Sequence, residues 1–217
     1  MNYYATAMNL LKKELTNISQ SVWQNGYEAI IFVSATLFFV LARYHPIQNE
    51  WLSSIIYFAV LPILVILFLL RKNPLDFGLG LGNVRVWGFY VLIIVLASAA
   101  ILYAASYDRT LQDYYQVDNF KLSSYFLTSL LSLSAQEFIY RGFLLFGLRG
   151  KFKEGAIFIQ MIPFALLHLA KPELETLSTI ITGVLFGYVA YRGKSYWPAL
   201  IIHLFINVFF ISLVNYK

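Results

Sequence analysis

The chain has 217 residues, of which 59% are hydrophobic and only 12% are charged, and its formal net charge is +5. So much apolar surface exceeds what one soluble core can bury, which excludes a soluble domain and indicates an integral membrane protein. The basic residues stand in small groups between apolar runs, which excludes a nucleic-acid-binding surface, and the absence of cysteine excludes thiolate catalysis, disulfides and cysteine-based metal sites.

Residues 1–26 are predicted to form a helix that lies along the membrane surface. Leu10, Leu11, Leu15 and Ile18 recur at helical spacing, and charged residues stand between them. An apolar stripe beside a charged one is typical of an amphipathic interfacial helix. The alternative is a flexible polar tail.

Residues 27–217 are predicted to form a single all-α transmembrane domain. A membrane-spanning helix needs roughly 20 mostly apolar residues. The seven candidate spans are 27–43, 51–70, 87–106, 122–148, 153–170, 175–192 and 196–214. There is room for an eighth, re-entrant segment, and no repeat or linker divides the series. We therefore expect a polytopic membrane helical bundle of about seven or eight transmembrane helices.

The basic residues predict the orientation of this bundle, because lysine and arginine are enriched in cytoplasmic loops. With seven spans, ten Lys and Arg residues fall on the side of the N-terminus and five on the opposite side, with Arg141 left inside a span. The N-terminus is therefore expected in the cytoplasm and the C-terminus outside.

A few strongly polar side chains interrupt the predicted spans. They are Gln136, Glu137, Arg141, His168, His203 and Asn207. A charged residue at mid-membrane costs roughly 2.5–3.5 kcal/mol on insertion scales, so such residues usually face a partner or a wet cavity.

The spacing of these residues groups them on helix faces, since positions four apart lie one above the other. Three pairs have this spacing, namely Glu137 with Arg141, Phe164 with His168, and His203 with Asn207, while Gln136 and Tyr140 form a neighbouring stripe. Three helices thus each present a polar stripe, and the simplest packing points them at one cavity.

The same residues admit structural interpretations. Glu137 and Arg141 could be an ion pair that locks helices together, and the histidines and Asn207 could hydrogen-bond neighbouring helices. A transporter is a further class, but the inverted repeats and broken helices that it predicts are not evident. Together, a carboxylate, two imidazoles and a carboxamide favour a hydrolytic site.

At these residues the sequence resembles the CPBP intramembrane proteases, also called the CAAX-protease and bacteriocin-processing (Abi) family. The family motif Glu-Glu-x-x-x-Arg is matched by "QEFIYR" except at its first position, Phe-x-x-x-His by "FALLH", and His-x-x-x-Asn by "HLFIN". The resemblance covers about residues 122–210, and three motifs in order on successive spans are a strong signal.

The resemblance implies peptide-bond hydrolysis in a bacterial cytoplasmic membrane, on a membrane-embedded peptide or a lipidated protein. A glutamate would activate water, His168 would position that water or shuttle its proton, and His203 and Asn207 would stabilise the oxyanion. Arg141 would hold a carboxylate, Phe164 would wall the cavity, and Tyr140 would stand beside the site. The alternative is a metal mechanism, with zinc on Glu137, His168 and His203 as ligands. The absence of His-Glu-x-x-His favours a mechanism without a metal cofactor.

Gln136 stands where the family has the glutamate that activates water, and an amide cannot accept that proton. Three interpretations stay open. Glu137 could act as the base instead, the chain could bind peptides or lipid tails without cutting them, as an immunity protein would, or the sequence could carry a deliberate Glu-to-Gln change.

Overall fold

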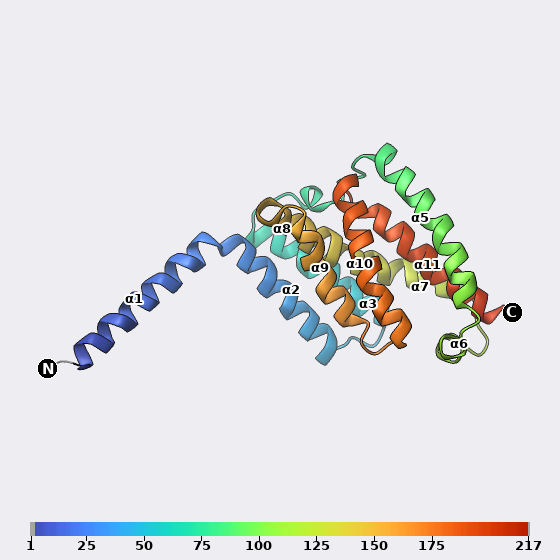
Figure 1. Ribbon diagram of the computed structural model, residues 1–217, viewed down its shortest axis with the longest axis horizontal. Helices are drawn as coiled ribbons and strands as arrows, with labels where there is room; N and C mark the ends of the chain where they lie inside the picture. The colour runs from blue at the N-terminus through green and yellow to red at the C-terminus, as the bar shows by residue number, and fades with distance from the viewer. Residues whose placement is uncertain (1–2, 217) are drawn as a thin grey trace.

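The computed structural model describes residues 3–216 and folds this part of the chain entirely into helices and connecting loops, without a strand. The helices pack into one bundle, from which the first projects (Figure 1). In chain order they are α1 (Tyr3–Gln24), α2 (Gly26–Tyr44), α3 (Glu50–Ile55), η1 (Ile56–Val60), α4 (Leu61–Leu64), η2 (Val65–Leu69), η3 (Pro74–Phe77), α5 (Val84–Ala105), α6 (Arg109–Tyr115), α7 (Leu122–Glu137), η4 (Phe138–Leu144), α8 (Leu145–Phe152), α9 (Gly155–Leu167), α10 (Glu173–Gly193) and α11 (Trp197–Asn215).

Helix α1 extends away from the bundle (Figure 1). The side chains of Met8, Leu10, Leu11, Leu15 and Ile18 are each more than half exposed. No core of the protein covers this face, so an apolar surface outside the protein is needed to bury it. Its contact with the membrane surface stays a prediction.

Five helical stretches of the described residues are long and apolar enough to cross a membrane. They are Gly26–Tyr44, Glu50–Leu69, Val84–Ala105, Glu173–Gly193 and Trp197–Asn215. The chain is therefore an integral membrane protein. Of the two other predicted spans, 122–148 corresponds to the run α7–η4–α8, and 153–170 corresponds to α9, which has only 13 residues. The exact number of spans stays a prediction.

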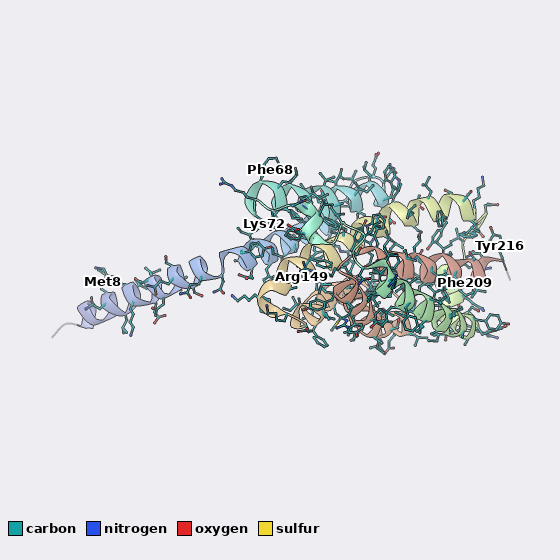
Figure 2. All side chains as sticks on the ribbon, turned by 90° about the horizontal axis from the view of Figure 1, so that it is seen from above. Met8, Phe68, Lys72, Arg149, Phe209 and Tyr216 are labelled. Carbon is teal, nitrogen blue, oxygen red and sulfur yellow. The ribbon has the colours of Figure 1, made fainter. Side chains whose placement is uncertain are left out.

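The two ends of the bundle gather different loops. At one end, here called the basic end (residues 70–85, 149–155 and 192–196), the Trp197 indole donates to the Leu79 carbonyl at 2.9 Å and Ser195 Oγ to the Gly80 carbonyl at 2.7 Å. At the other, the cavity end (residues 45–50, 106–121 and 168–175), Asn215 Nδ2 donates to the Tyr115 carbonyl at 3.0 Å. Figure 2 shows Lys72 and Arg149 toward the end that α1 joins, and Tyr216 at the opposite end.

Helices α9 and α10 pack closely because glycines line their interface. A Cβ on Gly183 would come within 3.0 Å of the Phe164 ring, and one on Gly187 would collide with the Gln160 amide. That buried amide donates to the carbonyls of Ile157 and Gly183, both at 2.8 Å. This contact fixes Phe164, and with it the end of α9, against α10.

Candidate active site

A buried ion pair and a histidine form the base of the site. Glu137, the last residue of α7, accepts hydrogen bonds on Oε1 from Arg141 Nη1 at 3.0 Å and from His203 Nδ1 at 2.7 Å. Glu137 and Arg141 have no exposed surface, and His203 is 9% exposed. Because a carboxylate can only accept, His203 Nδ1 carries the hydrogen, and a neutral ring then presents Nε2 as an acceptor.

The run that carries Arg141 is a π-helix, η4, which begins directly after Glu137. A π-helical turn is wider than an α-helical turn and often marks a functional position. All seven of its residues are buried. The Glu137–Arg141 pair nevertheless forms, so the face predicted from the spacing survives the wider turn.

Aromatic rings complete the surroundings of Arg141. Its guanidinium carbon lies 4.1 Å from the centre of the Phe164 ring and 5.2 Å from that of Phe186. Within the described residues, Nε and Nη2 find no hydrogen-bond acceptor, so these ring faces supply the remaining stabilisation of the charge. The Phe164 ring also contacts His168 and His203, with centroid distances of 4.8 Å and 5.8 Å. Phe164 therefore contacts the cation and both histidines.

Tyr140 lies beside the site, with its ring centre 5.4 Å from the Arg141 guanidinium carbon, but it lines neither of the cavities described below. It is fully buried, stacks on Phe39 at 5.5 Å and meets Phe164 edge-on at 5.4 Å. Its hydroxyl makes no hydrogen bond within the described residues. Tyr140 therefore packs the core behind the site.

Gln136 points about 100° around the helix from Glu137. Its side chain is half-buried, and Nε2 donates to Ser132 Oγ at 3.1 Å. Ser132 in turn lies 3.0 Å from Ser54 Oγ. Because Nε2 is engaged, Gln136 Oε1 is the atom able to accept a hydrogen bond from water or substrate.

His168 and Asn207 have defined orientations. His168 Nδ1 lies 2.8 Å from the Phe164 carbonyl, which can only accept, so a neutral ring again presents Nε2 as an acceptor. Asn207 Oδ1 accepts from Tyr125 OH at 2.7 Å and from Ser129 Oγ at 3.2 Å. Because Asn207 Oδ1 already accepts two hydrogen bonds, the amide nitrogen Nδ2 is the group left to donate to a substrate.

These side chains line two adjoining cavities. The polar cavity, of about 630 Å³, is lined by Glu50, Trp51, Tyr114, Tyr115, Tyr125, Thr128, Ser129, Ser132, Leu133, Gln136, Leu167, His168, Lys171, Glu175, His203 and Asn207. The apolar cavity, of about 250 Å³, lies among α5, α6, α9, α10 and α11. His168, His203 and Asn207 line both cavities, whereas Glu137 and Arg141 line neither. The two histidines and the carboxamide thus stand where a polar space meets an apolar one.

A rim residue that sequence reasoning missed also lines both cavities. Tyr115 OH donates to Glu175 Oε2 at 2.5 Å, and Lys171 Nζ lies 3.3 Å from the same hydroxyl. Burial raises the pKa of Tyr115 well above its usual range, and the hydrogen bond to Glu175 raises it further. Tyr115 therefore stays a protonated donor.

Tyr125 and Ser129 were missed as well, although the sequence carried a signal for them. Tyr125, Ser129, Ser132 and Gln136 are spaced four, three and four apart along α7, which places them on one helix face. That polar stripe is the wall of the polar cavity.

The metal alternative concerns the arrangement of the acidic and histidine side chains. Within residues 3–216, no three His, Asp or Glu side chains gather closely enough to hold a metal ion. The residues considered for zinc are Glu137, His168 and His203, but Glu137 Oε1 is already engaged by Arg141 and by His203 Nδ1. Glu137 Oε2 makes no hydrogen bond within the described residues, and the metal mechanism stays an alternative.

A comparison with protein families shows which family the residues of this site resemble. Residues 118–209 match the family described as type II CAAX prenyl endopeptidase Rce1-like. Residues 118–209 of the chain are therefore similar to the CPBP, or CAAX protease, family. The match contains Gln136, Glu137, His168, His203 and Asn207, so all three motifs of this CAAX-protease homologue lie inside it. No curated protein and no solved structure matches the chain.

Proposed function

We propose that this CAAX-protease family member is an intramembrane endopeptidase that hydrolyses a peptide bond of a membrane-embedded or lipidated peptide. One observation carries the proposal. His203, bonded through Nδ1 to a buried carboxylate, lines the same cavity as His168, Asn207 and Gln136. A carboxylate, an imidazole and a neighbouring amide donor are groups that can catalyse acyl hydrolysis by water.

His203 Nε2 accepts the proton of the attacking water. Glu137 acts on this nitrogen only through the imidazole ring, which it holds at Nδ1. Gln136 cannot take a proton from water. Glu137 lines neither cavity and is held by Arg141, so it reaches water only through His203. Glu137 is thus a positioning residue that fixes the tautomer of His203 and stabilises the imidazolium as it forms.

The reaction follows from these roles. Gln136 Oε1 accepts one water hydrogen, His203 Nε2 removes the other, and the water oxygen attacks the scissile carbonyl carbon. Asn207 Nδ2 donates to the resulting oxyanion, a contact worth roughly 3–4 kcal/mol in comparable sites. The imidazolium, or His168 as a shuttle, returns the proton to the amide nitrogen as the carbon–nitrogen bond breaks. The products are a carboxylate and an amine.

The paired cavities support a substrate with an apolar portion. The apolar cavity is walled by Ile101 and Leu102 of α5, Leu174 of α10 and Phe210 of α11. Helix α5 has no buried residue, so this wall borders lipid. An apolar side chain or lipid tail in this cavity would place the adjoining peptide bond beside His203 and Asn207.

We further propose that the protein resides in a bacterial cytoplasmic membrane with its N-terminus in the cytoplasm. The basic loops support this orientation. Arg71, Lys72, Arg85, Arg149, Lys151, Lys153, Arg192 and Lys194 all belong to the basic end. This end is joined to the start of α2 by the Lys151–Glu28 ion pair at 3.9 Å.

A non-catalytic binding protein is the second candidate, and Gln136 is the observation that favours it. Purified protein in lipid nanodiscs, incubated with membrane-embedded peptides, separates the two. We expect the unchanged chain to cleave, Gln136→Glu to cleave faster, and His203→Ala to be inactive. If Gln136→Glu cleaves and the unchanged chain does not, the chain is the binding protein. If no variant cleaves any peptide, the endopeptidase proposal fails.

A further inference from the structure

The polar cavity is closed toward the basic end. His203 lines its base, Glu137 and Arg141 lie buried behind His203, and every residue from Phe138 to Leu148 is buried. The Phe77 and Phe143 rings pack against each other beyond that base at 6.2 Å. Neither water nor a peptide has a path through this layer, because protein interiors are close-packed.

The walls of the polar cavity continue to the cavity end. Glu50 and Trp51 begin α3, Tyr114 lies in the last turn of α6, and Lys171 lies between α9 and α10. The rim is held in place, since Asn215 Oδ1 accepts from the Val117 N–H at 2.8 Å. Residues of three inter-helix connections thus surround one opening, which extends inward past Thr128 to Gln136.

The end that the cavity faces is the one poor in basic residues. The cavity end carries Arg109, Lys121 and Lys171, whereas eight Lys and Arg residues stand at the basic end. Acidic residues of the rim include Glu50 and Glu175. Because lysine and arginine are retained on the cytoplasmic side, the basic end is cytoplasmic.

We infer that the polar cavity opens to the outside of the membrane, so that the peptide and the water it uses arrive from the outer face. The inference rests on the proposed site and orientation, and it adds the class of substrate. The substrate is a peptide segment already inserted in or carried across the membrane, with its cleavable bond in the outer half. A segment that stays in the cytoplasm does not reach His203.

Cysteine labelling in intact cells tests this directly, because the chain contains no cysteine and each introduced thiol reports alone. Thr128→Cys places a thiol on the exposed wall of the polar cavity, outside the proposed catalytic groups. Lys72→Cys marks the basic end, and Asp118→Cys marks the cavity end, both at exposed positions. The probe is a sulfonated maleimide, which does not cross membranes and reacts only with thiols in contact with water.

We expect intact cells to label Thr128→Cys and Asp118→Cys, and Lys72→Cys to label only after permeabilisation. Labelling of Lys72→Cys alone in intact cells would overturn the inference by reversing the orientation. The inference would also be overturned if Asp118→Cys were labelled but Thr128→Cys stayed unlabelled even after permeabilisation. The cavity would then be closed to water. Neither result measures hydrolysis, so the endopeptidase proposal stands or fails separately in the nanodisc assay.

Discussion

Removing the Glu137 carboxylate should reduce stability and activity through different partners. Glu137 and Arg141 are both fully buried and meet at 3.0 Å. Removing one partner of a buried pair costs about 3–5 kcal/mol, because the other charge is left without a counterion. At about 2–4 °C per kcal/mol for a chain of this size, Glu137→Leu should lower the Tm by roughly 6–20 °C.

The double variant Glu137→Leu/Arg141→Met separates the two effects. It removes the orphaned charge as well, so only the His203 Nδ1–H lacks an acceptor, at a cost of about 1–3 kcal/mol. Roughly half of the lost Tm should return, since apolar replacement of a buried pair is often neutral. Activity should stay reduced by about 10³–10⁴-fold, the scale seen when a histidine base loses its carboxylate.

The assay pairs thermal unfolding in nanodiscs with the rate of cleavage of one membrane-embedded peptide. Arg141→Met alone is the matched control, because it leaves the carboxylate and His203 bonded. It should be destabilised and should keep more activity than either Glu137 variant. A double variant that regains both its Tm and its full kcat would refute the reasoning, since Glu137 would then only join helices.

Three further predictions concern single positions. Gln136→Glu should raise kcat at least tenfold, measured with the same peptide, because a carboxylate in the cavity can take the proton of water directly; an unchanged rate would mean that water does not bind at this position. Asn207→Ala should lower kcat by about 10²–10³-fold with little change in KM, as the loss of one oxyanion donor does; a pure KM effect would assign Asn207 to substrate binding. Gly187→Ala should destabilise the protein by about 1–3 kcal/mol, seen as a lower Tm, because the added Cβ would collide with the Gln160 amide. The control is Gly88→Ala, whose added Cβ would meet nothing within 4 Å and which should be neutral or stabilising.

The sequence indicated the candidate site residues because its signals are local, and their catalytic roles stay a prediction. A costly polar residue in an apolar run is visible without a structure, and a spacing of four residues places Glu137 with Arg141 on one face whether the turn is α or π. The resemblance to the CAAX-protease family, inferred from the three motifs, is confirmed by the family match over residues 118–209. The all-helical, membrane-integral fold is likewise confirmed, since hydropathy over about 20 residues reports it directly.

Other features depend on packing between distant segments. Adjacent residues such as Gln136 and Glu137 look equivalent in a motif, yet one lines the cavity and the other is buried behind His203. Which of the two reaches water is decided by α11, 66 positions further along the chain. Tyr115 joins the rim through Glu175, 60 positions away, and no local pattern marks that contact.

The most direct test of the account is a cleavage reaction in oxygen-18 water. The unchanged chain in nanodiscs is given a membrane-embedded peptide, and the products are weighed by mass spectrometry, with His203→Ala as the blank. Direct attack by water predicts that the new carboxyl terminus carries the heavy oxygen, and that the label is absent in the blank. Intact peptide from both the unchanged chain and Gln136→Glu would contradict the central claim that this site hydrolyses peptide bonds.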